Sequence, residues 1–278
     1  MLGLVLGGLL AWLGYRAQLL SSGGAVAVLV GMVIISLAAG WVWSLALLVT
    51  LASIGFWARF RQGFKRTINE RFRERARLGW WQILARIGWP VMLALLYGLL
   101  TPERGVFAAY IGALAATAAD GWGTELGVLS NQEPRLLISR IQVPAGTAGA
   151  ISILGLVAGV AASWLIGFAG LLLTAVEAWL DQLAVAPALF WLPVAAMIGG
   201  MAGSLTDSLL GATAQGITYC EHCKERSEYR VHSCGRPTQP VRGWSWLTND
   251  GINLVCSLVG AAVTAGAVTW LARFGGRW

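Results

Sequence analysis

Three carboxylates set within long apolar stretches are the residues of this sequence best suited to chemistry. Asp120 and Glu125 end one apolar run in A-D-G-W-G-T-E-L-G, and Asp207 lies in G-S-L-T-D-S-L-L-G-A-T-A-Q near the end of another. A carboxylate in such surroundings needs a cation or hydrogen-bond donors, because leaving it unpaired costs several kcal/mol. We therefore predict that these three carboxylates are catalytic and bind Mg²⁺, and a structural ion pair with Arg135 or Arg140 is the alternative.

Small polar residues accompany the carboxylates at helical spacing. Thr124 lies one turn from Asp120, and glycines at 203 and 211 flank Asp207 on one predicted helix face. Small residues on a face let a neighbouring group approach closely. We expect substrate contacts from Thr124 and, on the Asp207 helix, from Ser204, Ser208 and Gln215.

The last apolar run opens with T-N-D-G-I-N, which places an acid and two amides at one helix start. Helix capping by Thr248, Asn249 or Asp250 explains one of these residues. It does not explain Asn253, a full turn inside the predicted helix. We therefore add Asp250 to the catalytic candidates and Asn249 and Asn253 to the substrate-binding ones.

The segment V-P-A-G-T-A-G is predicted to open another span. Free backbone N–H groups at a helix start attract anions, so Gly146, Thr147 and Gly149 are candidate phosphate contacts. The alternative is an ordinary glycine-containing helix start, or small residues that permit close helix packing.

Basic residues are concentrated between residues 58 and 79, where they alternate with Phe60, Phe64 and Phe72. This pattern is typical of an amphipathic helix that lies on a membrane surface, held by anionic headgroups. The functional alternative is that Lys65, Arg75 or Arg77 turns inward to a substrate phosphate. Gln82 could be a cap or a ligand contact, and Arg135 is a further candidate for substrate binding.

Residues 218–246 form a polar insert that contains three of the four cysteines and both histidines. The order C-x-x-C followed by H-x-C can build a tetrahedral structural zinc site. Its expected ligands are Cys220, Cys223, His232 and Cys234, with His232 preferred to His222. A disulfide is the alternative, which a cytoplasmic location would disfavour.

Composition indicates a membrane protein. The 278 residues are 57% hydrophobic and 12% charged, with a mean hydropathy of +0.67, which is too apolar for a soluble domain. We expect an all-α polytopic fold, with residues 1–278 forming a single transmembrane domain of about eight helices. The apolar runs that support this count cover residues 2–14, 24–40, 41–57, 80–100, 105–118, 147–174, 187–215 and 252–271.

Charge distribution predicts the orientation. Residues 59–77 hold eight basic and two acidic side chains, so this loop is expected in the cytoplasm. Counting spans from there places the carboxylates, the glycine-rich loop and the insert on the cytoplasmic side as well. We expect the plasma or inner membrane of a prokaryote.

Taken together, A-D-G-W-G-T-E-L-G, P-A-G-T-A-G-A-I-S, G-S-L-T-D-S-L-L-G-A-T-A-Q, the C-x-x-C…H-x-C insert and T-N-D-G-I-N-L resemble the integral membrane family called domain of unknown function 92. That family includes transmembrane protein 19 and a phytyl-phosphate kinase of tocopherol synthesis. The resemblance covers roughly residues 60–272. Gly121, Gly123 and Arg86 depart from the family pattern, which has Thr, Ala and Asn at these positions.

The resemblance implies transfer of a phosphoryl group from a nucleoside triphosphate, CTP by analogy with dolichol-kinase-like enzymes, to a prenyl (phytyl or polyprenyl) monophosphate. Carboxylates for Mg²⁺ and donors for phosphate oxygens fit this reaction. Two alternatives use the same residue types. A lipid-phosphate cytidylyltransferase would release pyrophosphate, and a secondary transporter would use intramembrane carboxylates to bind a coupling ion.

Overall fold

The computed structural model describes residues 2–65, 77–100, 104–227, 230–232 and 234–275. Within them, each predicted apolar run forms a helix: α1 (Leu2–Arg16), α2 (Ser22–Ala39), α3 (Trp41–Arg59), α5 (Trp80–Leu99), α6 (Arg104–Gly127), α7 (Ile153–Leu180), α8 (Leu192–Thr213) and α9 (Asn249–Gly275). A 3-10 helix, η1 (Pro187–Trp191), precedes α8. Six of these segments are long and apolar enough to cross a membrane, so the helical membrane fold is confirmed. The count of eight spans stays a prediction.

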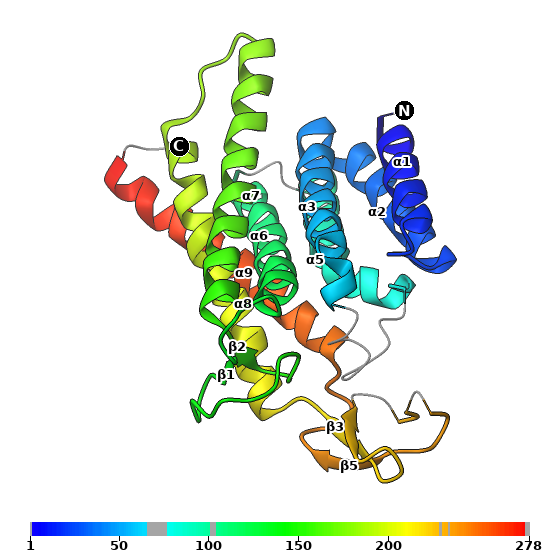
Figure 1. The fold of residues 1–278 in the computed structure, drawn as a ribbon. Coiled ribbons are helices and arrows are strands. Elements are labelled where there is room, and N and C mark those ends of the chain that lie inside the picture. The colour runs from blue at the N-terminus through cyan, green and yellow to red at the C-terminus, as the bar shows by residue number, and fades with distance from the viewer. Residues whose placement is uncertain (1, 66–76, 101–103, 228–229, 233, 276–278) are drawn as a thin grey trace.

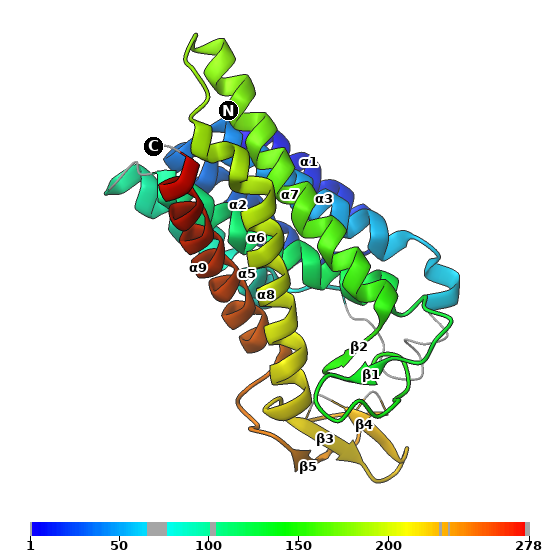
Figure 2. The same ribbon diagram turned by 90° about the vertical axis from the view of Figure 1, so that its left-hand side faces the viewer.

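Helix α6 is the centre of the molecule, with α3, α5, α7, α8 and α9 packed around it (Figures 1 and 2). Every residue from Tyr110 to Ala119 is buried, as expected of a helix that is apolar on all sides. The Tyr110 hydroxyl donates a hydrogen bond of 2.6 Å to the Trp43 carbonyl oxygen, which joins α6 to α3. The first carboxylate of the candidate site, Asp120, lies directly after this buried stretch.

Glycines bring α6, α8 and α9 close enough for backbone contact. A Cβ atom at Gly203 or at Gly260 would lie 2.6 Å from the Ala116 Cβ atom, and Gly260 is equally close to the Gly112 carbonyl oxygen. Side chains larger than hydrogen would therefore separate these helices. The close packing holds the polar residues of the three helices near one another.

The connections at one end of the bundle contain two small antiparallel sheets, so the fold is not purely α-helical. In the α6–α7 connection, β1 (Arg135–Leu136) pairs with β2 (Ala150–Ile151). In the α8–α9 connection, β3 (Ile217–Cys220) is the middle strand between β4 (Glu225–Ser227) and β5 (Gln239–Arg242). Figure 1 shows both sheets beneath the same end of the helices.

The predicted start of the sixth span was wrong. Helix α7 begins at Ile153, not near Thr147, and the hydroxyl of Ser152 caps it by accepting a hydrogen bond of 3.1 Å from the Gly155 N–H. Gly146 and Gly149 have φ angles of +89° and +76°, which lie outside the helical region. The glycine-rich segment is thus a loop, and its N–H groups do not form a helix start.

Candidate functional site

A small polar cavity lies between α5, α6 and α9 at the end of the buried part of α6. Its volume is about 10 Å³, close to the volume that one water molecule or ion requires. Asp120 and Thr117 line it from α6, and Arg86 lines it from α5. The residues that line it from α9 are Asn253, Cys256 and Ser257.

Asp207 reaches the same region from α8. Its Oδ1 atom lies 4.0 Å from the Cys256 Sγ atom, and Cys256 itself lines the cavity. Two of the predicted metal-binding carboxylates, Asp120 and Asp207, therefore both lie near Cys256. We call Arg86, Asp120, Asp207, Asn253 and Cys256 the four-helix polar cluster.

Two buried hydrogen-bond donors of this cluster are the Arg86 Nε atom and the Asn253 Nδ2 atom. Neither has an acceptor among the described residues. An unsatisfied buried donor costs about 1–3 kcal/mol, so such atoms usually have a partner from solvent or a ligand. The cluster thus combines two carboxylates with donors suited to an anionic group.

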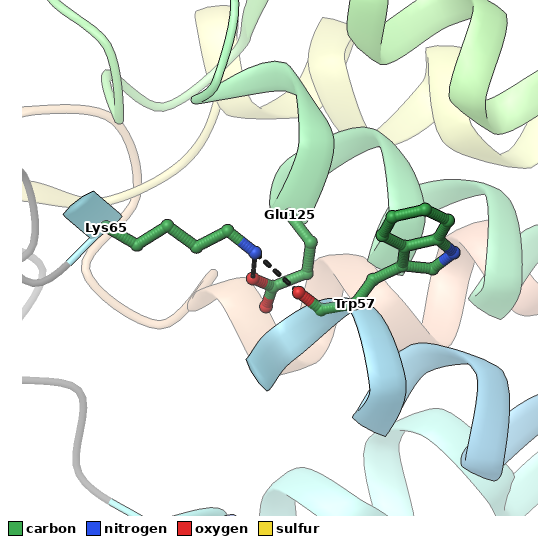
Figure 3. A network of polar contacts seen from close by, with 3 residues as sticks. All are labelled: Trp57, Lys65 and Glu125. Carbon is green, nitrogen blue, oxygen red and sulfur yellow. Dashed lines mark hydrogen bonds and ion pairs between the residues drawn. The ribbon is translucent and has the colours of Figure 1, made fainter. Parts of the chain in front are cut away.

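The third carboxylate, Glu125, faces a cation instead. Its Oε2 atom lies 3.0 Å from the Lys65 Nζ atom, and Lys65 also donates a hydrogen bond of 2.5 Å to the Trp57 carbonyl oxygen (Figure 3). Residues five apart on a helix point about 140° away from each other, which explains why Glu125 and Asp120 have different neighbours. The structural alternative predicted Arg135 or Arg140 beside Glu125, but the cation found there is Lys65. The Lys65 side chain is buried, and not exposed as expected for a surface amphipathic helix.

Several predicted substrate contacts have structural roles. Gln82 is a cap, because its Oε1 atom accepts a hydrogen bond of 2.6 Å from the Gly79 N–H at the start of α5. Thr147 donates to the Pro144 carbonyl oxygen at 2.7 Å within its own loop. Gly149 packs against α8, where a Cβ atom would lie 2.2 Å from the Ala212 backbone nitrogen.

The remaining predicted contacts lie on the same elements but outside the small cavity. Thr124 is exposed on α6, and Asn249 is exposed at the start of α9, with Asp250 beside it partly buried. Ser204 and Ser208 are neighbours on α8, where the Ser208 hydroxyl donates to the Ser204 carbonyl oxygen at 3.4 Å. Gln215 is buried just beyond α8, near Gly211. Arg75 lies outside the described residues.

A second cavity, of about 460 Å³, lies between the α6–α7 connection and the start of α7. Arg135 and Arg140 line it, together with Gln132, Glu133 and Ser152. The Ser152 hydroxyl donates to the Gly127 carbonyl oxygen at 3.2 Å, so this cavity adjoins the end of α6. Its volume lies in the range of small-molecule sites.

In the insert, the structure brings together the four predicted zinc ligands. One ligand atom from each of Cys220, Cys223, His232 and Cys234 lies within 4.8 Å of the others. The backbone N–H of Cys223 is the main cause of a lowered pKa at Cys220, whereas the neighbouring Cys234 and Cys220 sulfur atoms raise the pKa of Cys223 to about 11. Thiolates this close repel one another, and a bound cation would balance their charge.

Arg86, Thr117, Cys256 and Ser257 were missed by the sequence analysis as site residues. Arg86 carried a usable signal, because it is a charged residue inside an apolar span and such residues usually face a polar interior. The other three are small or weakly polar residues with no distinguishing pattern. Only the packing of α5, α6 and α9 reveals them.

The helices and the buried polar cluster define a polytopic helical membrane protein with a polar site near one end of its bundle. Residues 5–261 match the profile of the integral membrane protein family DUF92, and the chain belongs to that family. It is 28% identical to Protein PGR of Arabidopsis thaliana over 96% of this chain and 95% of that protein. It is also 39% identical to the uncharacterized membrane protein MJ0933 of Methanocaldococcus jannaschii, over 41% of this chain and 43% of that protein. No solved structure shows significant similarity.

Proposed function

We propose that this protein is a membrane-embedded prenyl-phosphate kinase, which transfers a phosphoryl group from CTP to a phytyl or polyprenyl monophosphate to give the diphosphate. The observation that carries the proposal is the four-helix polar cluster, where Asp120 lines an ion-sized cavity and Asp207 lies 4.0 Å from Cys256 on its wall. Family membership and the similarity to Protein PGR are compatible with this activity.

The donor set fits Mg²⁺. Asp120 lines the cavity of about 10 Å³, and Asp207 lies 4.0 Å from Cys256 on its wall. Carboxylate oxygens are the ligands that this ion prefers, and its remaining positions are usually taken by water and phosphate oxygens. Asp120 and Asp207 would hold the ion, and the bound ion would neutralise charge on the phosphates. Glu125 is not part of the proposed set, because its Oε2 atom pairs with the Lys65 Nζ atom at 3.0 Å.

The protein residues would position the two phosphates. The Arg86 guanidinium supplies a fixed positive charge beside Asp120, and the Asn253 amide supplies a buried donor. An acceptor phosphate is already ionised at neutral pH, so the transfer needs no strong general base. This agrees with the sequence, in which both histidines belong to the insert.

We assign the nucleotide to the 460 Å³ cavity. Arg135 and Arg140 offer positive charge there, and Ser152 ties its wall to Gly127, seven residues beyond Asp120 on α6. Seven residues of helix span about 10 Å, comparable to the length of a triphosphate. By the positive-inside argument, this end of the bundle faces the cytoplasm, where the nucleotide is available.

The test is product analysis with purified protein in detergent, using CTP labelled on either the γ or the α phosphate together with phytyl or polyprenyl monophosphate. A kinase transfers the γ label to the lipid and releases CDP, in a reaction that requires Mg²⁺. Incorporation of the α label with release of pyrophosphate would establish a cytidylyltransferase instead. If no nucleotide or lipid is consumed, uptake assays in vesicles would then test the transporter. Parallel reactions with ATP and GTP identify the nucleotide.

A further inference from the structure

The insert between α8 and α9 carries a compact group of soft metal ligands that the proposed reaction does not use. Cys220 ends β3 and is fully buried, and Cys223 lies in the turn that leads to β4. His232 and Cys234 come from the segment before β5. Their ligand atoms all lie within 4.8 Å of one another, although the chain separates the first from the last by fourteen residues.

The sulfur–sulfur spacing distinguishes a metal site from a disulfide. The Cys220 and Cys234 Sγ atoms are 3.8 Å apart, whereas a disulfide bond is about 2.05 Å long. Four ligands at about 2.3 Å from a central zinc ion form a tetrahedron whose edges are about 3.8 Å. All four cysteines of the chain are free thiols, which agrees with this spacing.

The backbone is shaped around the same centre. Lys224, directly after Cys223, has a φ angle of +56°, and Gly235, directly after Cys234, has a φ angle of +80°. Left-handed residues at these positions reverse the chain immediately beyond each cysteine. The Gly235 N–H donates to the His232 carbonyl oxygen at 2.8 Å, which closes the second turn.

The insert also connects α8 and α9, which carry three of the five residues of the four-helix polar cluster. The Gly216 N–H donates to the Leu247 carbonyl oxygen at 3.1 Å, and the Trp244 N–H donates to the Ala214 carbonyl oxygen at 2.9 Å. Arg242 donates to the Gly211 carbonyl oxygen at 2.7 Å. These contacts join β3 and β5 to the end of α8 and to the segment just before α9.

We propose that Cys220, Cys223, His232 and Cys234 bind one Zn²⁺ ion in a closed structural site that fixes the α8–α9 connection. Three thiolates and one imidazole complete a tetrahedral coordination sphere, so the ion has no open position for a substrate. Binding stabilises the folded insert, and through it the relative placement of Asp207 on α8 and Asn253 on α9. This site is independent of whether the proposed kinase activity is correct.

The test measures metal content by elemental analysis on full-length protein purified in detergent without chelators. Wild-type protein is expected to carry about one zinc per chain. Cys223→Ser and His232→Ala are expected to lose most of it. The matched controls His222→Ala, which removes the other histidine, and Cys256→Ser, which removes the buried cysteine of α9, are expected to keep it. Equal zinc loss in a variant and its control would overturn the ligand assignment.

A second readout identifies the coordination without relying on activity. Replacement of zinc by Co²⁺ should give the intense visible absorption of a tetrahedral centre and a thiolate charge-transfer band in the near ultraviolet. Should Cys223→Ser not accumulate, His232→Cys provides the conservative variant, which is expected to retain zinc with four thiolates. Metal-free wild-type protein with two titratable thiols after denaturation would indicate a disulfide. Metal-free wild-type protein with four titratable thiols would indicate that the cysteines are reduced but bind no metal. Either result contradicts the proposal.

Discussion

The Nζ atom of Lys65 lies 3.0 Å from the Oε2 atom of Glu125, and the two side chains are only 3% and 6% exposed. The pair ties the segment after α3 to the last turns of the central helix α6 (Figure 3). A buried ion pair adds little to folding stability compared with an apolar pair of similar size. Loss of one partner, however, leaves the other charge buried and unpaired, which is strongly destabilising. The pair therefore constrains the structure beside the candidate site.

Glu125→Gln is expected to destabilise the protein by about 3–5 kcal/mol, because it leaves the Lys65 ammonium buried without its partner. The double variant Lys65→Met/Glu125→Leu should recover much of this loss. Unfolding in detergent measures both, with Arg140→Met as a control at an exposed cation. A double variant that is no more stable than Glu125→Gln would show that the unpaired Lys65 charge does not cause the loss of stability.

Asp120→Asn and Asp207→Asn are each expected to reduce phosphoryl transfer by at least about 100-fold while the protein stays folded. In the proposed site, loss of either carboxylate would remove negative charge that holds Mg²⁺ on the phosphates. Activity with γ-labelled CTP, measured beside size-exclusion profiles and thermal unfolding, separates catalysis from stability. Glu177→Gln, near the far end of α7, is the control and should have wild-type activity. Wild-type turnover in both aspartate variants would remove them from the site.

Gly260→Ala is expected to lower stability by about 1–3 kcal/mol, because the added methyl group would overlap Ala116 and the backbone of Gly112. Gly266→Ala on the same helix meets open space and should be neutral or slightly stabilising. The two alanines differ only in their neighbours, so a difference in melting temperature reports the α6–α9 packing directly. Equal melting temperatures would show that this contact is looser than the structure indicates.

Gly149→Ala is expected to destabilise the glycine-rich loop more than Gly146→Ala does. Both positions have left-handed φ angles, which cost an alanine about 1–2 kcal/mol, but a methyl group at Gly149 would also meet the backbone of Ala212. Limited proteolysis of the α6–α7 connection should reveal the difference as faster cleavage in Gly149→Ala. Indistinguishable cleavage rates would argue against the packing of this loop on α8.

Chelation with excess EDTA, followed by removal of the chelator, is expected to abolish kinase activity that Mg²⁺ then restores. The proposed carboxylate site exchanges its ion readily, since Mg²⁺ is held by few protein ligands and several waters. The proposed zinc content should fall more slowly, because it requires the insert to open. Parallel assays of activity and zinc over time distinguish the two ions. Activity that returns only with zinc would show that the metal roles assigned above are reversed.

The amino-acid sequence alone determined the membrane class, the approximate position of each long helix and the ligands to test in the insert. Apolar runs of membrane-spanning length and a C-x-x-C…H-x-C order are local signals, because each depends on residues close together in the chain. Helix caps were ambiguous in the sequence. Gln82 could be a cap or a ligand contact, and the structure shows that it caps α5. Thr147 was expected at the start of α7, but the residue that caps this helix is Ser152.

Only the tertiary structure decided which charges meet. Lys65 and Glu125 are sixty residues apart, and nothing in their local sequence indicates that they pair. Arg86 joins Asp120 because α5 and α9 pack against α6, and Asp207 reaches Cys256 because glycines bring α8 and α9 together. The partner of a buried charge depends on the rotation and spacing of packed helices, which are set by contacts between distant segments. The periodicity of a single helix predicts which of its residues share a face. It does not predict which residues of a neighbouring helix that face contacts.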